Sequence, residues 1–205
     1  MDRHDTLEHR YDLLTDKVLS SMRVAAGDCG DVIEEMRPVC STQLSGKRFS
    51  YVMKTDDDSY VDLPLLLSWL NGTPRERMYG GRIISGAGVI DSKTQRWGNR
   101  QFFEDTGLRT YPAYASGSGY VLSHDLAVYL AQRAVPWKTW RIEDGSLGSY
   151  LLGLDISYQD NKLIAIDIKD VDEACQIPWM VMHKLTVPHL HYAHSHCRHK
   201  APWQD

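Results

Sequence analysis

The stretch that decides the fold is residues 51–61, Tyr-Val-Met-Lys-Thr-Asp-Asp-Asp-Ser-Tyr-Val. The apolar residues at its start predict a short buried strand over residues 49–53, and the acidic triplet Asp56, Asp57 and Asp58 follows at once. Three adjacent carboxylates repel one another unless a cation or solvent compensates their charge. At the end of a buried strand they would project into a cleft at the carboxyl edge of a sheet, where ligands bind in open α/β sheets. Their hard oxygen atoms favour Mg²⁺ or Mn²⁺, which would bridge to phosphate oxygens.

The acidic triplet could also have a role other than this kind of metal site. A solvated acidic turn is the plainer one, but the apolar strand before the triplet and the Tyr-Val pair after it favour a ligand site. An EF-hand loop starting at Asp56 is excluded, because its sixth position needs Gly and its twelfth Glu, and these positions hold Val61 and Leu67. A phosphatase of the haloacid-dehalogenase type also begins with a strand and Asp-x-Asp, and would use Asp56 as nucleophile. That alternative stays open.

Two further segments carry groups that could do chemistry. Glu143 and Asp144 stand at the start of a predicted helix, a common place for acids because carboxylates favour a helix N-terminus. His183 follows an apolar stretch, where a lone histidine is usually structural. Histidines also crowd the segment after 188 next to Cys197; such clusters can hold transition metals, but we favour an exposed tail.

Hydrophobic periodicity and turn residues predict an alternation of helices and strands, and hence an α/β domain. Asp62 is expected to cap the helix that follows it, with Pro64 in the first turn, and Ser123 to cap another. The expected helices cover residues 5–26, 63–70, 124–133 and 144–152, the expected strands residues 49–53, 78–85, 120–122, 155–158 and 163–167, and a long loop residues 86–112.

Composition narrows the class of protein. The chain has 205 residues, 42% hydrophobic and 24% charged, and a net charge of -4, which indicates one globular domain. Without a long basic run it has no electrostatic footprint for nucleic acid. The four cysteines form no Cys-x-x-Cys pair, so a zinc ribbon is disfavoured, while disulfides and reduced thiols both remain open. No signal peptide or membrane-spanning run is evident.

The motifs together resemble the family 31 glycosyltransferases, the β-1,3-galactosyltransferase group, over roughly residues 8 to 195. The resemblance rests on their order and spacing as well as their content. The matching blocks are residues 11–17, the Lys-x-Asp-Asp-Asp block at 54–61, the Tyr-Pro-x-Tyr-x-x-Gly-x-Gly-Tyr-Val-Leu-Ser block at 111–123, the Glu-Asp block at 143–148 and the Met-His-Lys block at 182–184.

The resemblance implies a GT-A-like fold, with a mixed central sheet flanked by helices, and an inverting hexosyltransferase. Such an enzyme moves a sugar, galactose above all, from a UDP-sugar to a hydroxyl of a glycan or glycoprotein acceptor in β-1,3 linkage. Asp56 and Asp57 would contact the donor nucleotide. Asp58 and His183 would bind Mn²⁺ or Mg²⁺, and Asp144 would be the catalytic base. The resemblance also implies that the protein is located at the Golgi membrane, on its lumenal side.

Two departures from the family pattern affect these expectations. The early nucleotide-binding part and the membrane anchor have no counterpart before residue 8, so we expect a catalytic domain over 1–188 that is truncated at its N-terminus, followed by a His-rich tail over 189–205. Gly145 replaces the family's valine and would loosen the start of the helix that carries Asp144. A non-catalytic relative that binds glycan or a partner therefore stands as an alternative.

Overall fold

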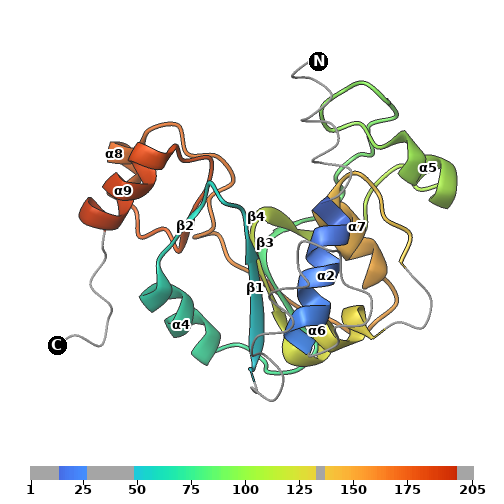
Figure 1. The fold of residues 1–205 in the computed structure, drawn as a ribbon, viewed down its shortest axis with the longest axis horizontal. Coiled ribbons are helices and arrows are strands. Elements are labelled where there is room, and N and C mark those ends of the chain that lie inside the picture. The colour runs from blue at the N-terminus through green and yellow to red at the C-terminus, as the bar shows by residue number, and fades with distance from the viewer. Residues whose placement is uncertain (1–13, 27–48, 133–136, 198–205) are drawn as a thin grey trace.

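The computed structural model describes residues 14–26, 49–132 and 137–197. The chain forms a mixed α/β structure in which a central sheet is flanked by helices (Figure 1). The elements in chain order are α2 (Leu14–Ala26), β1 (Tyr51–Thr55), β2 (Tyr60–Val61), α4 (Leu63–Asn71), β3 (Met78–Ile84), α5 (Arg100–Thr106), β4 (Tyr114–Ser123), α6 (His124–Ala131), α7 (Glu143–Tyr150), β5 (Ser157–Asp160), α8 (Val171–Ala174), β6 (Val181–Met182) and α9 (Val187–His196).

The central sheet has the strand order β1-β4-β3-β5. The long strand β4 runs antiparallel to both of its neighbours, while β5 runs parallel to β3, so the sheet is mixed. A second, two-stranded sheet joins β2 to β6. That small sheet matters for the site, because it fixes the segment after the acidic triplet to the segment just before His183.

Both faces of the central sheet are buried. Alternate residues of one strand point to opposite faces, and Tyr120 and Leu122 pack with α2, α6 and α7, whereas Val121 packs with α4 and β6. Figure 1 shows these two groups of helices on opposite sides of the sheet. A central strand covered on both faces needs a nearly continuous apolar sequence, which explains why residues 120–122 stood out.

Two expected helix starts are present. The Asp62 side chain accepts a hydrogen bond from the Leu65 amide at 3.0 Å, which caps α4 as predicted. Ser123 occupies the position before α6, but its hydroxyl makes no capping bond there. Instead Ser123 Oγ accepts from the Met78 amide at 2.9 Å, which joins β4 to the start of β3.

Three expected elements differ in the structure, and a fourth can be compared only in part. The predicted loop over 86–112 contains a helix, α5, and strand β4 begins at Tyr114 rather than at residue 120. Residues 163–167 make only an isolated bridge from Ile164 to Val181 and no strand. The described part of the helix predicted over 5–26 begins at Leu14, and the rest of that prediction lies outside the described residues.

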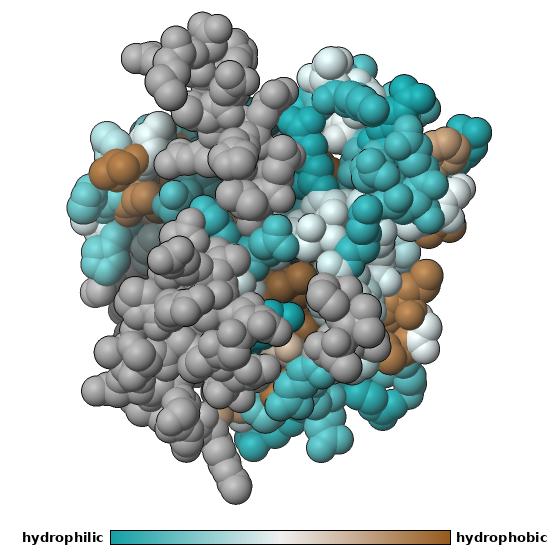
Figure 2. Space-filling model, turned by 45° about the vertical axis from the view of Figure 1, so that its right-hand side comes forward, coloured by the Kyte–Doolittle hydropathy of each residue, from teal (hydrophilic) through white to brown (hydrophobic). Residues whose placement is uncertain are grey.

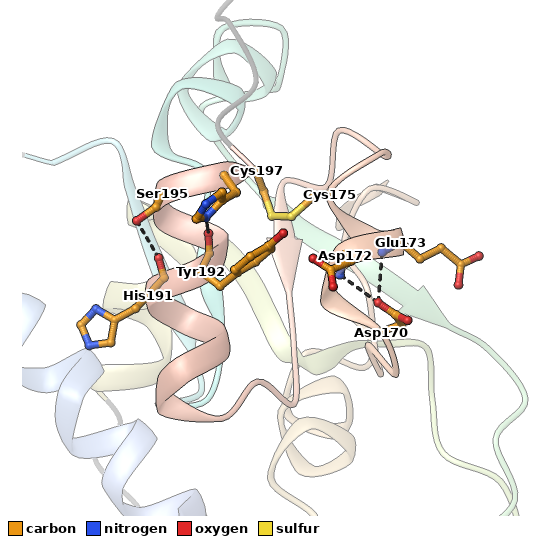
Figure 3. The surroundings of a disulfide bond; sticks show 9 residues. Asp170, Asp172, Glu173, Cys175, His191, Tyr192, Ser195 and Cys197 are labelled. Carbon is orange, nitrogen blue, oxygen red and sulfur yellow. Dashed lines mark hydrogen bonds between the residues drawn. A yellow bond between two sulfur atoms is a disulfide. The ribbon is translucent and has the colours of Figure 1, made fainter.

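The described part of the histidine-rich segment, up to Cys197, is mostly helical. Helix α9 covers 187–196, with Thr186 as its N-cap, and the predicted boundary at 188 falls inside it. A disulfide joins Cys175, at the end of α8, to Cys197, at the end of α9 (Figure 3). The histidine side chains of α9 are exposed, as expected, while Ala193 and Cys197 are buried. The other two cysteines lie outside the described residues.

Among the coloured residues in the view of Figure 2, apolar residues form separate patches beside hydrophilic ones. Exposed large apolar side chains include Leu63 and Leu67 on α4 and Val187 on α9. Among the residues that the structure describes, no helix combines the length and the apolar character needed to cross a membrane.

Candidate active site

A pocket of about 600 Å³ opens where the acidic triplet, strand β4, the start of α7 and the segment after β6 come together. These segments are far apart in the sequence and are joined by the pairing of β1 with β4 and of β2 with β6. Four of the five predicted site residues line it, namely Asp56, Asp58, Asp144 and His183. Asp57 is exposed and is not among the lining residues.

Asp56, Asp58 and His183 form a cluster on one side of the pocket. Each offers one possible ligand atom, and these atoms lie within 4.8 Å of one another. Backbone hydrogen bonds fix the segment that carries His183. The His183 carbonyl accepts from the Ile168 amide, and the Leu185 amide, two residues further on, donates to the carbonyl of Asp58. The imidazole is only 12% exposed, so its position is set by packing as well as by these bonds.

Hydrogen bonding leaves this cluster with acceptor atoms to spare. Ser59 Oγ donates to the Ser118 carbonyl at 3.2 Å and lies 3.0 Å from His183 Nδ1, so Nδ1–H donates to Ser59 and Nε2 keeps its lone pair. Nε2 lies 3.9 Å from Asp56 Oδ2. Asp58 Oδ1 is buried and lies 3.1 Å from His183 Nδ1, but with the Nδ1 proton directed to Ser59 it has no hydrogen-bond partner in the described part of the chain. Two carboxylates and one imidazole with free lone pairs suit a divalent cation such as Mn²⁺ or Mg²⁺.

Asp144 also lines the pocket, from the first turn of α7. Its Oδ2 accepts from the Gly117 amide at 2.9 Å, and its Oδ1 accepts from the Gly145 amide at 2.8 Å. Burial raises the pKa of the Asp144 carboxyl above its usual value, although these two amides and Lys54 act to lower it. Each carboxylate oxygen keeps a second lone pair, so Asp144 can still accept a proton from a ligand in the pocket.

Lys54 and Glu143 form a buried ion pair next to Asp56 and Asp144, and the sequence did not reveal it. Lys54 Nζ lies 2.6 Å from Asp56 Oδ1 and 3.5 Å from Glu143 Oε2, and the Tyr120 hydroxyl donates to Glu143 Oε1 at 2.6 Å. Burial raises the pKa of Glu143 to about 7, although Lys54 and Tyr120 act to lower it. Burial acts to lower the pKa of Lys54, but the carboxylates of Glu143 and Asp56 outweigh it and raise that pKa above its usual value.

Gly145, which we expected to loosen the start of α7, contributes to the packing around the pocket. It lies inside the first turn of α7, with its amide bound to Asp144. A Cβ atom at this position would come within 2.8 Å of the Tyr111 ring. Tyr111 itself lines the pocket and accepts a hydrogen bond from Asn99 Nδ2 at 2.7 Å. The glycine therefore makes room for an aromatic wall beside the carboxylate.

Aromatic residues near the pocket differ in whether a ligand could stack on them. Tyr120 is fully buried in the core and cannot stack on a ligand. Tyr114 is 9% exposed and Trp97 is 49% exposed, and both line the pocket. The sequence analysis assigned no role to Lys54 and treated Glu143 only as an acid at a helix start. The one sequence signal for Lys54 was its place in the Lys-x-Asp-Asp-Asp block.

Comparison with known proteins shows the family of the chain. The profile of the galactosyltransferase family matches residues 42–162, more than half of the chain. The chain therefore belongs to the galactosyltransferase family. This matched region contains the acidic triplet, β4 and Asp144, and membership removes the support for a phosphatase of the haloacid-dehalogenase type.

Individual relatives carry more specific names. Beta-1,3-galactosyltransferase 6 of Mus musculus is 32% identical over 139 residues, which are 66% of this chain and 41% of the relative. UDP-GalNAc:beta-1,3-N-acetylgalactosaminyltransferase 2 of Xenopus laevis is 30% identical over 118 residues, 56% of this chain and 23% of the relative. Beta-1,3-galactosyltransferase 1 of Mus musculus is 29% identical over 149 residues, 71% of this chain and 40% of the relative. The chain thus matches less than half the length of each of these relatives.

Proposed function

We propose that this protein is an inverting hexosyltransferase that moves a sugar, most simply galactose, from a UDP-sugar to a hydroxyl of a glycan or glycoprotein acceptor in β-1,3 linkage. The observation that carries the proposal is that Asp56, Asp58, His183 and Asp144 all line one pocket. The names of the relatives, which are β-1,3-galactosyl- and β-1,3-N-acetylgalactosaminyltransferases, support the sugar class and the linkage.

The donor side would be formed by the cluster of two carboxylates and the imidazole. Asp58 and His183, with Asp56 beside them, would hold a Mn²⁺ or Mg²⁺ ion. Such an ion, when bound, neutralises the charge of the donor diphosphate and of the UDP that leaves. Asp56 would also approach the donor nucleotide. Asp57, which is exposed and outside the pocket lining, would contact the donor only from the rim.

The acceptor side would be formed by Asp144. The acceptor hydroxyl oxygen attacks the anomeric carbon of the donor sugar, the bond between that carbon and the UDP oxygen breaks, and Asp144 takes the hydroxyl proton. Attack from the side opposite the leaving UDP inverts the anomeric configuration. The amides of Gly117 and Gly145 hold the carboxylate in one orientation, and burial raises the pKa of Asp144 toward the range of an effective general base.

We also propose that the protein works in the lumen of the secretory pathway, in the Golgi as the family resemblance implies, where its partners would be nucleotide sugars and glycans. The Cys175–Cys197 disulfide supports an oxidising compartment.

The test is a transfer assay with UDP-galactose and UDP-N-acetylgalactosamine, Mn²⁺ and a panel of glycan acceptors, together with calorimetric titration of UDP. We expect transfer that disappears in Asp144→Asn and metal-dependent UDP binding that disappears in Asp58→Ala. Asp155→Asn is the matched control, because Asp155 is exposed outside the pocket. UDP binding without any transfer would instead support the non-catalytic, glycan- or partner-binding alternative. Absence of both would refute the proposal.

A further inference from the structure

Lys54 has no part in the proposed transfer step, yet its side chain contacts three residues of the candidate site. Its side chain is 12% exposed. Besides the carboxylates of Asp56 and Glu143, its Nζ donates to the carbonyl of Gly117 at 2.8 Å. An ammonium group has three N–H donors and no acceptor; Lys54 uses two of them in hydrogen bonds to Asp56 and Gly117, and Glu143 is its ion-pair partner.

The three partners of Lys54 line the pocket from three different segments of the chain. Asp56 belongs to the donor side, at the end of β1. Gly117, on β4, uses its carbonyl to bind Lys54 and its amide to bind Asp144 Oδ2. Glu143 directly precedes Asp144 in the first turn of α7. One ammonium group therefore contacts the loop that carries the metal cluster, the residue that precedes the proposed base, and the residue whose amide binds that base.

We propose that Lys54 is a positioning residue that sets the distance between the donor-binding carboxylate of Asp56 and the base Asp144. The inference rests on the proposed function for its meaning, but its geometry can be tested apart from activity. Gly117 lies beside both groups: a Cβ atom added there would be in ordinary contact, 3.5 Å from Lys54 Nζ and 3.4 Å from Asp144 Oδ2. Because the Gly117 carbonyl binds Lys54 and its amide binds Asp144, a displacement of the ammonium group would be passed to the base through this residue.

A purely structural role is the competing explanation, since Lys54 also compensates the buried charge of Glu143. Removing one member of a buried ion pair destabilises a protein because the other member is left uncompensated. Removing both members relieves that cost. The two explanations therefore differ in what the double variant recovers.

The experiment compares Lys54→Met, Glu143→Gln and the double variant, with Lys138→Met as the control at an exposed lysine that pairs with Asp105. Methionine keeps the length of the stem without the charge. We expect kcat to fall about 100-fold in Lys54→Met, since a misplacement of about 1 Å costs that much. In the double variant the melting temperature should recover while kcat stays low, because the bonds to Asp56 and Gly117 remain lost. Recovery of both, or a kcat within about twofold of wild type in Lys54→Met, would overturn the inference.

A second readout does not depend on transfer. The amide groups of Gly117 and Gly145 both bind Asp144, so their ¹H–¹⁵N resonances report its position. Both should shift in Lys54→Met and stay in place in Lys138→Met. If the wild type transfers no sugar and the two resonances still shift, the proposed function fails while Lys54 keeps its role in placing Asp144. If they do not shift, the inference is wrong whatever the activity.

Discussion

Replacing Glu143 with glutamine should change how the stability of the protein depends on pH. Glu143 is 5% exposed, and burial raises its pKa from 4.5 to about 7 in the folded chain. Between these two values the folded state binds more protons at this group than the unfolded state does. The stabilisation is therefore complete below about pH 4.5 and is lost as the pH rises through about 7.

The size of the effect follows from the pKa difference. One pKa unit corresponds to about 1.4 kcal/mol, so the shift of Glu143 amounts to roughly 3 kcal/mol between the two ends of the range. For a domain of this size, about 1 kcal/mol moves the melting temperature by about 2–4 °C, so the full effect is roughly 6–12 °C. Glutamine has the same shape and can still accept from the Tyr120 hydroxyl, but it does not titrate.

The assay is urea unfolding of wild type and Glu143→Gln at several values from about pH 4.5 to about pH 8. Burial also raises the pKa values of Asp144 and Asp16, but those groups contribute to both proteins and largely cancel in the difference. The wild type should lose stability relative to the variant as the pH rises. Two parallel curves would mean that Lys54 keeps Glu143 ionised throughout and would refute the reasoning.

Three further changes test separate parts of the fold. Gly145→Val should lower stability by about 1–3 kcal/mol, because its side chain would meet the Tyr111 ring; Gly88→Val, where a Cβ meets nothing within 4 Å, is the control in a thermal melt, and equal melting temperatures for the two would contradict the packing argument. Asp62→Ala should cost about 1 kcal/mol by removing the cap of α4, and Asp62→Asn should retain most of it in urea unfolding; an equal loss in both variants would assign the effect to charge rather than capping. Replacing Cys175 and Cys197 together by serine should cost about 2–4 kcal/mol, because a cross-link between positions 22 residues apart constrains the unfolded chain. Chemical denaturation measures that loss, and an unchanged midpoint would show that the bond does not contribute.

Local signals made much of the fold predictable. The apolar run before the triplet, the aspartate before Leu63 and the acid pair at the start of α7 each correspond to an element in the structure. These signals act within one turn or one strand, where the chemistry of neighbours in sequence decides the conformation. The helix α5 was missed because polar and glycine residues around it indicated a loop.

The arrangement of the site could be predicted only in part. The motifs pointed to Asp58, His183 and Asp144, and the structure brings these residues to one pocket. The Lys54–Glu143 ion pair was not predicted, because it depends on the register of strand pairing. In the pairing of β1 with β4, Lys54 stands opposite Tyr120, and only this register brings both residues to Glu143. A shift by one residue would turn Lys54 to the other face of the sheet, and no local pattern fixes that choice.

The separation of the site residues along the chain bears on the order of folding. Lys54 and Gly117 are 63 residues apart, and Ser59 and His183 are 124 residues apart. Contacts this distant form only after the loops between them have closed, which makes them slow to appear. The helices can begin to form early, but the pocket is completed only when β4 has paired and His183 has reached the triplet. During refolding, recovery of ligand binding should therefore lag behind recovery of helical signal.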